Sequence, residues 1–387
     1  MKRVSQSLSD PQFVQNPYPF YARAQAAGDI VDWPEFGMPC AVSHRAVQAV
    51  LRDRRMGREP VAPPEPAEHT RAFYAVEAHS MLELEPPRHT RLRGLVLRAF
   101  TSRRIAELAP EISALADELA SAMTGEVDVL DAFARPLPVR IIARLLGVPE
   151  TLAPQLLAWS NAMVAMYQVG RTRAVEDAAN TAAAEFSEFL RGYVEERRTR
   201  PADDLITHLI AAEEDGARLS TDELITTCIL LLNAGHEATV HTLGNGLAAL
   251  LTHDHRHIDE AVVEEILRYD PPLHIFTRWV YEDVEVLGTP LAAGSQVACI
   301  LGAAGRDPQV YDHPNTFDPA RYTAKVAPHA AFGSGLHFCV GAPLARLELR
   351  IGLERLLHHH PHLRLVEPPH YGDTYHFHGL ERLLVAT

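Results

Sequence analysis

The stretch FGSGLHFCVG at residues 332–341 surrounds one of the chain's four cysteines, Cys339, with three glycines and a histidine. Glycine allows backbone dihedrals that other residues avoid, and it lets a flat ligand approach the main chain closely. The next segment, APLARLELRIGLERLL, keeps Leu344, Leu347 and Ile351 at helical spacing, so Cys339 lies just before a helix N-terminus. The backbone N–H groups and the helix dipole favour a thiolate there, and a thiolate is a strong metal ligand. For an isolated cysteine, the alternative is a small buried side chain in a tight turn.

The composition narrows the classes of protein to which the chain can belong. It has 387 residues, of which 47% are hydrophobic, and a formal net charge of -14. That charge repels phosphate backbones, which argues against nucleic acid as a partner. The sequence shows no signal peptide and no apolar run of the roughly 20 residues that a membrane span needs, so we expect a cytoplasmic protein. The cysteines form no CxxC pair, so we expect neither a disulfide framework nor a zinc ribbon. The HHHP run at 358–361 resembles a metal tract only in composition, and we assign no metal to it.

Helical periodicity dominates the chain, and shorter strand patterns occur near both ends and after residue 278. We therefore expect a mainly α-helical fold, with a larger helical lobe and a smaller lobe that contains β-structure. A single domain spanning residues 1–387 is predicted. Its helical core is predicted at 88–268 and 342–357, and its β-rich parts near 28–45, 278–301 and 363–387.

The segment FGSGLHFCVGAPLAR resembles the haem-binding loop of the cytochrome P450 family nearly position for position. The resemblance runs from about residue 15 to the C-terminus, and it implies the fold of that family, with haem between the two lobes. It assigns Cys339 as the axial ligand of haem b, iron protoporphyrin IX, where a thiolate favours cleavage of the O–O bond. Phe332 would lie against the haem near the sulfur, His337 would reach a haem propionate, and Gly341 belongs to the same loop.

Two further motifs follow in the order that the family has. EILR, from Glu265 to Arg268, resembles its ExxR pair, and the three-residue spacing places both side chains on one helix face. FDPARY at 317–322 resembles the segment whose arginine, here Arg321, completes a buried Glu-Arg-Arg cluster behind the haem loop. The implied role of these three residues is structural. Taken alone, EILR fits a solvated ion pair better.

The resemblance also implies four anchors for the haem propionates. PPRHTRLR at 86–93 resembles the start of a helix that carries His89 and Arg93 on one face. Arg278, in PPLHIFTRWV, matches another propionate-binding arginine, and His337 is the fourth anchor. Anionic propionates taken out of water need cationic or strong donor partners. For each of these residues separately, a solvated surface position is the alternative.

One long helix is predicted from STDELITTC onward, because Ser220 and Glu223 have capping-box spacing and no proline interrupts the pattern. Its AGHEAT segment resembles the oxygen-binding segment of the family. Gly235 would leave room for dioxygen beside the helix. Glu237 would help to deliver protons to it.

The residue after this acid departs from the family, which usually has a threonine there. The chain has Ala238 and then Thr239, and a helix turns by about 100° per residue, so Thr239 cannot simply replace the missing hydroxyl. Three hypotheses follow: an ordered water or a substrate hydroxyl donates the proton, Thr239 acts through a shifted helix, or the enzyme uses peroxide or couples its electrons poorly to product. We favour the first.

The segment RHTRLRGLVLRAFTSRR at 88–104 has six arginines and no acidic residue. A solvated helix face is one interpretation. Given the resemblance, we favour a docking surface for an acidic ferredoxin or flavodoxin-type electron donor, because such patches steer encounter. No flavin or ferredoxin module is recognisable in the chain, so the NAD(P)H reductase would be a separate protein.

Substrate-facing positions follow by analogy with the family. They would form a mostly apolar pocket with a few polar points, suited to a lipophilic small molecule. Histidines at such half-buried positions are more often structural than substrate-binding. The predicted positions are Phe73, Val76, Met163, Met166, Leu232, His236, His274, Phe276 and Phe377.

The expected function is that of a haem-thiolate monooxygenase, which inserts one oxygen atom from O2 into a small or medium lipophilic substrate. A peroxide-using or oxidative-coupling enzyme is the alternative that Ala238 motivates. A haem-binding sensor without turnover is the alternative from another class. Glu237 and the basic segment argue against the sensor, and NADH consumption with a generic ferredoxin pair would discriminate.

Overall fold

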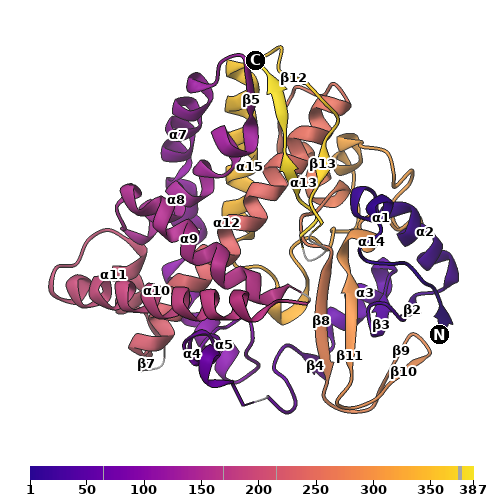
Figure 1. Ribbon diagram of the computed structural model, residues 1–387, viewed down its shortest axis with the longest axis horizontal. Coiled ribbons are helices and arrows are strands. Elements are labelled where there is room, and N and C mark those ends of the chain that lie inside the picture. Colours follow the sequence, from indigo (N-terminus) through magenta and orange to yellow (C-terminus); the bar gives the residue numbers. More distant parts are fainter. Residues whose placement is uncertain (64, 169, 215, 374–376) are drawn as a thin grey trace. The chain divides into compact units, whose positions relative to one another are not determined.

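The computed structural model of the chain describes residues 1–63, 65–168, 170–214, 216–373 and 377–387. The chain is mainly helical with short strands, as its periodicity predicts, and it divides into two compact units (Figure 1). Among the described residues, no helix is long and apolar enough to cross a membrane. Unit 1 comprises Met1–Val61, Ser113–Ala134 and Ala238–Thr387, and unit 2 comprises Ala62–Ile112 and Arg135–Glu237.

A six-stranded sheet lies in unit 1. Alternate residues of its strand β11, Gln296–Ile300, belong to two different apolar clusters. Val297 and Cys299 pack in the first cluster, and Ala298 and Ile300 pack in the second. The first cluster includes the buried face of α3 His44–Arg52, and the second includes aromatic residues of α1 Pro11–Gln15 and α2 Tyr18–Ala27. The strand order is β1 Lys2–Arg3, β2 Ile30–Trp33, β3 Met38–Ala41, β11 Gln296–Ile300, β8 Ile275–Val280 and β4 Met56–Gly57.

The remaining elements of unit 1 are helices and small sheets. They come from residues 260–387, together with one segment at residues 126–134. These elements are α13 Glu260–Tyr269, α14 Leu301–Ala304, α15 Ala342–His359, the hairpin β9 Val284–Val286 and β10 Thr289–Leu291, the three-stranded sheet β12 Arg364–Leu365, β15 Leu384–Ala386 and β5 Glu126–Asp128, the pair β13 His370–Tyr371 and β14 Leu380–Arg382, a π-helical turn Leu130–Ala134, and 3-10 turns at Pro319–Thr323 and Gly335–His337.

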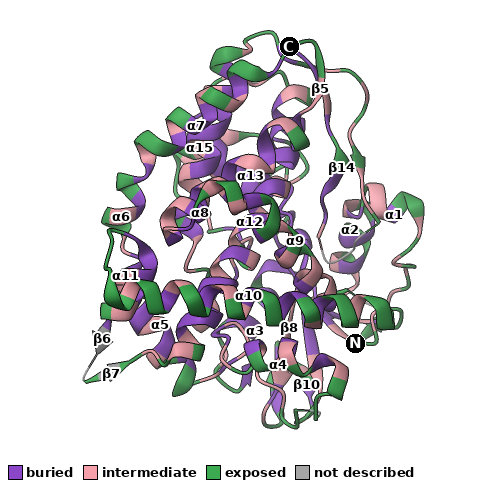
Figure 2. Ribbon diagram, turned by 60° about the vertical axis from the view of Figure 1, so that its left-hand side comes forward, coloured by how far each residue is buried: buried purple, intermediate pink, exposed green. Residues whose placement is uncertain are grey.

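Unit 2 is almost entirely helical in its described residues. Its longest helix, α10 Arg173–Thr199, buries residues at three- and four-residue spacing and leaves the opposite side exposed (Figure 2). The other elements are α4 Arg71–Glu77, α5 Arg88–Ala99, α6 Ser102–Glu107, α8 Pro136–Leu146, α9 Ala153–Val164, α11 Leu205–Ala211, the short strands β6 Glu213–Glu214 and β7 Ala217–Arg218, and 3-10 turns at Glu68–Thr70, Glu150–Leu152 and Ala165–Tyr167.

Two helices contribute residues to both units: α7 Ala109–Ala122 and α12 Thr221–Thr252. The predicted capping box forms at the start of α12. The backbone N–H of Ser220 donates to Oε2 of Glu223 at 2.9 Å, and the N–H of Glu223 donates to Oγ of Ser220 at 3.2 Å. The long helix expected from the sequence is therefore confirmed, with its first residue at Thr221.

Candidate functional site

The cysteine loop, residues 332–341, leads into α15 in unit 1. The backbone N–H of Cys339 donates to the carbonyl of Phe332 at 3.0 Å, which closes the loop on itself. Gly335 has a φ of 71°, and a Cβ atom there would lie 2.4 Å from the carbonyl oxygen of Leu51 in α3. Only glycine fits this position, so the sequence of the loop fixes its shape against α3.

Cys339 is the exposed member of the four cysteines, and the other three are buried. Burial raises the pKa of Cys228 and Cys299 to about 12, and it raises the pKa of Cys40 as well. These three thiols therefore keep their protons at neutral pH and are poor ligands. Cys339 is the cysteine that the fold places at a helix N-terminus, where a thiolate is favoured.

Phe332, at the start of the loop, lies among three side chains that the sequence did not point to. The guanidinium carbon of Arg346 lies 4.6 Å from the centroid of the Phe332 ring, and the His329 ring centroid lies 5.9 Å from it. Both neighbours bind Glu264 of α13: Nη2 of Arg346 donates to Oε2 at 3.0 Å, and Nε2 of His329 lies 3.1 Å from the same oxygen. Burial alone would raise the pKa of Glu264, but these bonds lower it to about 2. The carboxylate therefore stays charged and holds both side chains against the loop.

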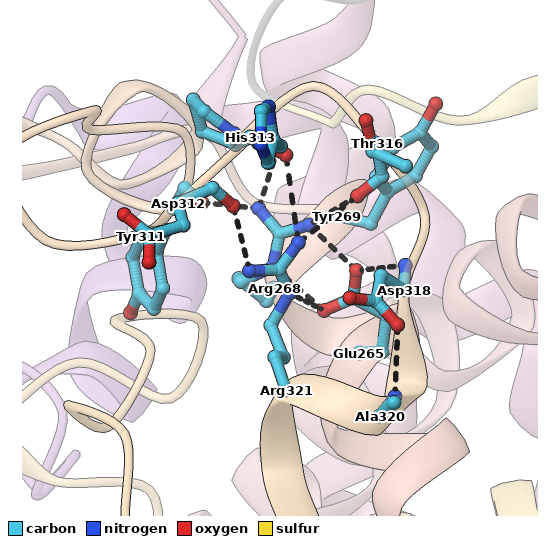
Figure 3. A network of polar contacts seen from close by, with 12 residues as sticks. Glu265, Arg268, Tyr269, Tyr311, Asp312, His313, Thr316, Asp318, Ala320 and Arg321 are labelled. Atoms are coloured by element: carbon cyan, nitrogen blue, oxygen red, sulfur yellow. Dashed lines mark hydrogen bonds and ion pairs between the residues drawn. The ribbon is translucent and has the colours of Figure 1, made fainter.

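The predicted Glu-Arg-Arg cluster joins Glu265 and Arg268 of α13 to Arg321 of the 3-10 turn Pro319–Thr323 (Figure 3). Arg268 donates from Nε and Nη2 to the two carboxylate oxygens of Glu265, each at 2.7 Å, and both side chains have no exposed surface. Nε of Arg321 lies 3.1 Å from Oε2 of Glu265.

Backbone groups satisfy the rest of this cluster. Arg268 donates to the carbonyls of Gly305 and Pro314, each at 2.8 Å, and the N–H of Asp318 donates to Glu265 at 2.7 Å. Removing one member would leave an unpaired charge in the interior, which lowers the free energy of unfolding by about 3–5 kcal/mol. The cluster ties α13 to the segment that leads to the cysteine loop.

Strand β8 packs against the cysteine loop in unit 1. A Cβ atom at Gly333 would lie 3.1 Å from the ring of Phe276. Arg278, two residues further along β8, is 3% exposed and donates from Nη1 to the carbonyl of Thr277 at 2.8 Å. His337 lies half-buried in the 3-10 turn of the loop. Two of the four predicted propionate anchors therefore belong to elements that form or contact the loop.

The other two predicted anchors lie on α5 of unit 2. His89 is 1% exposed and Arg93 is half-buried, and their four-residue spacing places both on one face of the helix.

The basic segment at 88–104 is partly neutralised by local pairs. Arg91 pairs with Glu223, and Nε of Arg103 lies 2.9 Å from a carboxylate oxygen of Glu107. Arg104 contacts a histidine of α11. The net positive charge available to a partner is therefore smaller than the sequence alone indicates.

The AGHEAT segment lies in the middle of α12. A Cβ atom at Gly235 would lie 3.0 Å from Cδ1 of Ile142, so a larger side chain would require the Ile142 side chain to shift. Glu237 and Ala238 are half-buried, and Thr239 is 5% exposed. The carbonyl of Ala238 accepts a hydrogen bond from the hydroxyl of Thr242 at 2.6 Å.

Some predicted substrate positions come together in unit 2. The carbonyl of Val76 in α4 accepts a bond from a threonine of α12, and Met163 of α9 lies 3.8 Å from Nδ2 of Asn233 in α12. Phe73 contacts the ring of Tyr167, the residue after Met166. The buried side chains that α4, α9, the turn Ala165–Tyr167 and α12 contribute are Phe73, Val76, Met163, Met166, Leu232 and His236.

The predicted substrate positions of unit 1 do not form one group. Phe276 packs on the cysteine loop, and Phe377 lies 5.6 Å from the ring of His241 and bridges to Leu273. His274 is enclosed by aromatic rings of α2 and by His378. The role predicted for these positions stays a prediction.

Unit 1 thus contains a glycine-fixed loop that places an exposed cysteine just before a helix N-terminus, and it contains a buried Glu-Arg-Arg cluster. Comparison with known proteins gives the family. The sequence profile of the family described as cytochrome P450 matches residues 139–258 and 254–370. The cytochrome P450 monooxygenase PikC of Streptomyces venezuelae is 40% identical over 375 residues, which cover 92% of this chain and 87% of that protein. The vitamin D(3) 25-hydroxylase of Pseudonocardia autotrophica is 35% identical, covering 97% and 94%.

Solved structures agree with this result. The crystal structure of P450BioI, in complex with an acyl carrier protein ligated to hexadec-9Z-enoic acid, superposes with a TM-score of 0.91 at 30% identity and covers 98% of this chain and 100% of that chain. The chain belongs to the cytochrome P450 family and is a monooxygenase of bacterial type. The fold that the resemblance implied is confirmed, and the family implies a haem cofactor.

Proposed function

We propose that this monooxygenase binds haem b through Cys339 and inserts one oxygen atom of O2 into a lipophilic small molecule. The observation that carries the proposal is the contrast among the four cysteines. Three of them are buried, and burial raises their pKa values. The fourth, Cys339, is exposed and lies on a glycine-rich loop just before α15. Haem supplies an iron that activates dioxygen, and the protein binds and orients the reactants.

The residues present fit this cofactor. Gly333 and Gly335 have left-handed φ values of 69° and 71°, so the loop carries no Cβ atom at either turn. Phe332 is held in place by Arg346, which leaves an aromatic ring fixed beside the cysteine. A planar macrocycle needs flat apolar contact beside its metal ligand, and this loop provides it.

Four side chains are proposed to bind the haem propionates: Arg278 and His337 of unit 1, and His89 and Arg93 of unit 2. Arg278 and His89 are almost fully buried, although cationic or polar side chains usually stay in water. An anionic group taken out of water explains why such donors are kept inside.

Proton delivery depends on the middle of α12. We assign Glu237 to hold and pass protons, because it is the acid of the segment and is half-buried. Ala238 has no hydroxyl, and Thr239 is buried one position further along the helix. The proton donor nearest the oxygen is therefore an ordered water or a hydroxyl of the substrate. The same alanine favours a second candidate function, in which the enzyme uses peroxide or couples phenols.

Electrons are proposed to come from a separate ferredoxin or flavodoxin-type donor and its NAD(P)H reductase, in the cytoplasm. The exposed Arg88 and Arg98 of α5 are the residues that we assign to the docking surface. Because Arg91 and Arg103 are already paired, the surface steers encounter with modest charge.

The relatives guide the choice of substrate. PikC is a monooxygenase of Streptomyces venezuelae, another relative is the polyketide biosynthesis cytochrome P450 PksS of Bacillus subtilis, and P450BioI is seen with a fatty acid on a carrier protein. We infer a lipophilic substrate of the polyketide or fatty-acyl type. A carrier protein presenting the acyl chain belongs in any substrate search.

Two spectra test the proposal. The reduced, carbon-monoxide-bound protein is expected to show the red-shifted band of thiolate-ligated haem, and Cys339→Ser is expected to lose that band while keeping the fold. Absence of the band in the unaltered protein would refute the ligand assignment. Titration of the ferric protein with macrolactones, fatty acids and acyl carrier proteins is then expected to give a low-to-high-spin shift with one class.

A further inference from the structure

A second group of metal-ligating side chains lies in unit 1, apart from the cysteine loop. Asp270, His274 and His378 are all buried, and one ligand atom from each lies within 4.8 Å of the others. Asp270 follows α13, His274 precedes β8, and His378 precedes β14. Two segments that are distant in sequence, the connection from α13 to β8 and the segment before β14, therefore bring two imidazoles and one carboxylate together.

The backbone holds these three donors in place. Nδ2 of Asn245, in α12, donates to the carbonyls of both Asp270 and His378, at 3.3 and 2.8 Å. The N–H of His378 donates to the carbonyl of Pro272 at 2.7 Å, and the carbonyl of His274 accepts from the N–H of Leu301 at the same distance. The donors are pre-positioned by the fold, which is what a structural metal site needs.

One buried ring nitrogen of this group makes no hydrogen bond to the described residues. Nδ1 of His274 lies 2.9 Å from the hydroxyl of Tyr21, which fixes the ring. Its Nε2 has no hydrogen-bond partner among the described residues, although the side chain is only 1% exposed. A buried nitrogen without a partner costs free energy, so it calls for a ligand.

A small cavity of about 10 Å³ borders the two histidines but not Asp270. It gives the histidine side of the group room for one occupant of about the size of a water molecule. Phe13, Pro17 and Phe377 close its other sides.

The polar and charged neighbours of the group determine whether it can hold a cation. Asp270 accepts hydrogen bonds from the hydroxyls of Tyr18 and Tyr371. Arg306 opposes a cation, but its guanidinium lies 3.9 Å from the ring centroid of Tyr18 and 3.7 Å from that of Tyr269, and it donates to the Tyr269 carbonyl at 2.7 Å.

We propose that Asp270, His274 and His378 form a buried structural site for one divalent transition-metal ion, best matched by Zn²⁺. Two neutral imidazoles and a carboxylate form a typical donor set for zinc. Nε2 of His378 lies 3.4 Å from Oδ1 of Asp270, which is close to the separation that ligands about 2.0–2.1 Å from a tetrahedral zinc ion have. The Nε2 atom of His274 is the third ligand, and a tyrosine oxygen or a water is the fourth. The site would pin the C-terminal segment to the connection between α13 and β8 and would remove His274 from contact with substrate.

The test measures the zinc content of the protein, because mass spectrometry distinguishes zinc from the iron of haem. The holoenzyme is stripped with a chelator, incubated with Zn²⁺, passed through gel filtration and measured by plasma mass spectrometry. About one zinc ion per chain is expected to remain bound and to raise the melting temperature. His378→Gln and His274→Gln are expected to lose both effects. His358→Gln is the matched control, because it removes an exposed histidine from the run near the end of α15.

Zinc X-ray absorption on the unaltered protein separates the buried site from the surface histidines. Two imidazoles with oxygen ligands are expected, and three or more imidazoles would assign the zinc to the surface run and overturn the proposal. Zinc content near zero after filtration, or equal retention in the His274 and His378 variants, would overturn it as well. If His378→Gln does not fold, the zinc X-ray absorption spectrum of the unaltered protein and the zinc content of His274→Gln decide whether the proposal holds.

Discussion

Glu348 of α15 is a buried acid whose protonation sets a pH dependence of stability. Its side chain is 1% exposed, and its Oε1 atom has no hydrogen-bond partner among the described residues. Burial raises its pKa from the ordinary 4.5 to about 8. The folded chain therefore keeps this carboxyl protonated at pH 7, whereas the unfolded chain ionises it.

The free energy follows from the difference between the two states. At pH 7 the unfolded carboxyl is 2.5 pH units above its pKa of 4.5, and at about 1.36 kcal/mol per unit its protonation on folding costs roughly 3.4 kcal/mol. Because the folded state binds the proton more tightly, this cost is absent below pH 4.5 and grows as the pH rises toward 8. Stability therefore falls with rising pH in that window.

Replacing Glu348 by glutamine removes the titration while keeping size and shape. The variant has to bury two amide hydrogens, which costs about 1 kcal/mol, so we expect a net gain of roughly 2 kcal/mol at pH 7. The gain should vanish near pH 5. Urea unfolding followed by circular dichroism across pH 5–8 measures it. Glu354→Gln is the control, because Glu354 lies on the same helix with its side chain 53% exposed. A Glu348→Gln effect that does not change with pH would refute the reasoning.

Three other perturbations test the loop and the proton route. Gly335→Ala forces a Cβ atom into a backbone carbonyl at a left-handed φ, so we expect a loss of at least about 1–2 kcal/mol in stability and a lower haem-to-protein ratio, read from absorption. Glu264→Gln removes the negative charge, and one of the two acceptor oxygens, that His329 and Arg346 bind. Because the pKa of Glu264 is lowered to about 2, the contribution of its charge is present above pH 4.5 and lost as the pH falls toward 2, so variant and parent should converge in acid melts. Ala238→Thr restores the usual hydroxyl, and we expect more product per electron pair in a reconstituted assay; unchanged coupling would mean that the alanine does not shape proton delivery.

Local patterns predicted the parts of the molecule that depend on neighbours in sequence. The capping box of α12, the glycine-rich cysteine loop and the Glu265–Arg268 pair each have a fixed short spacing, and the structure contains all three arrangements. The Glu264–Arg346 contact joins residues 82 positions apart, so no spacing rule announces it. Glu264 directly precedes the ExxR glutamate, and this pair of adjacent acids on one helix is the only trace of the contact in the local sequence.

For Glu348, the residue type predicts an exposed side chain, whereas its position in α15 predicts the buried one that the structure shows. A glutamate in LARLELRIGLERLL reads as solvated, because charged side chains rarely enter the interior. Yet it lies four residues after Leu344 and three before Ile351, both buried, and that spacing places it on the buried face of α15. The face is therefore set by the register of the helix, and the acid adapts by keeping its proton. The same logic applies to Asp270, His274 and His378: the fold buries titratable groups first, and their chemistry follows from what the interior allows them to bind.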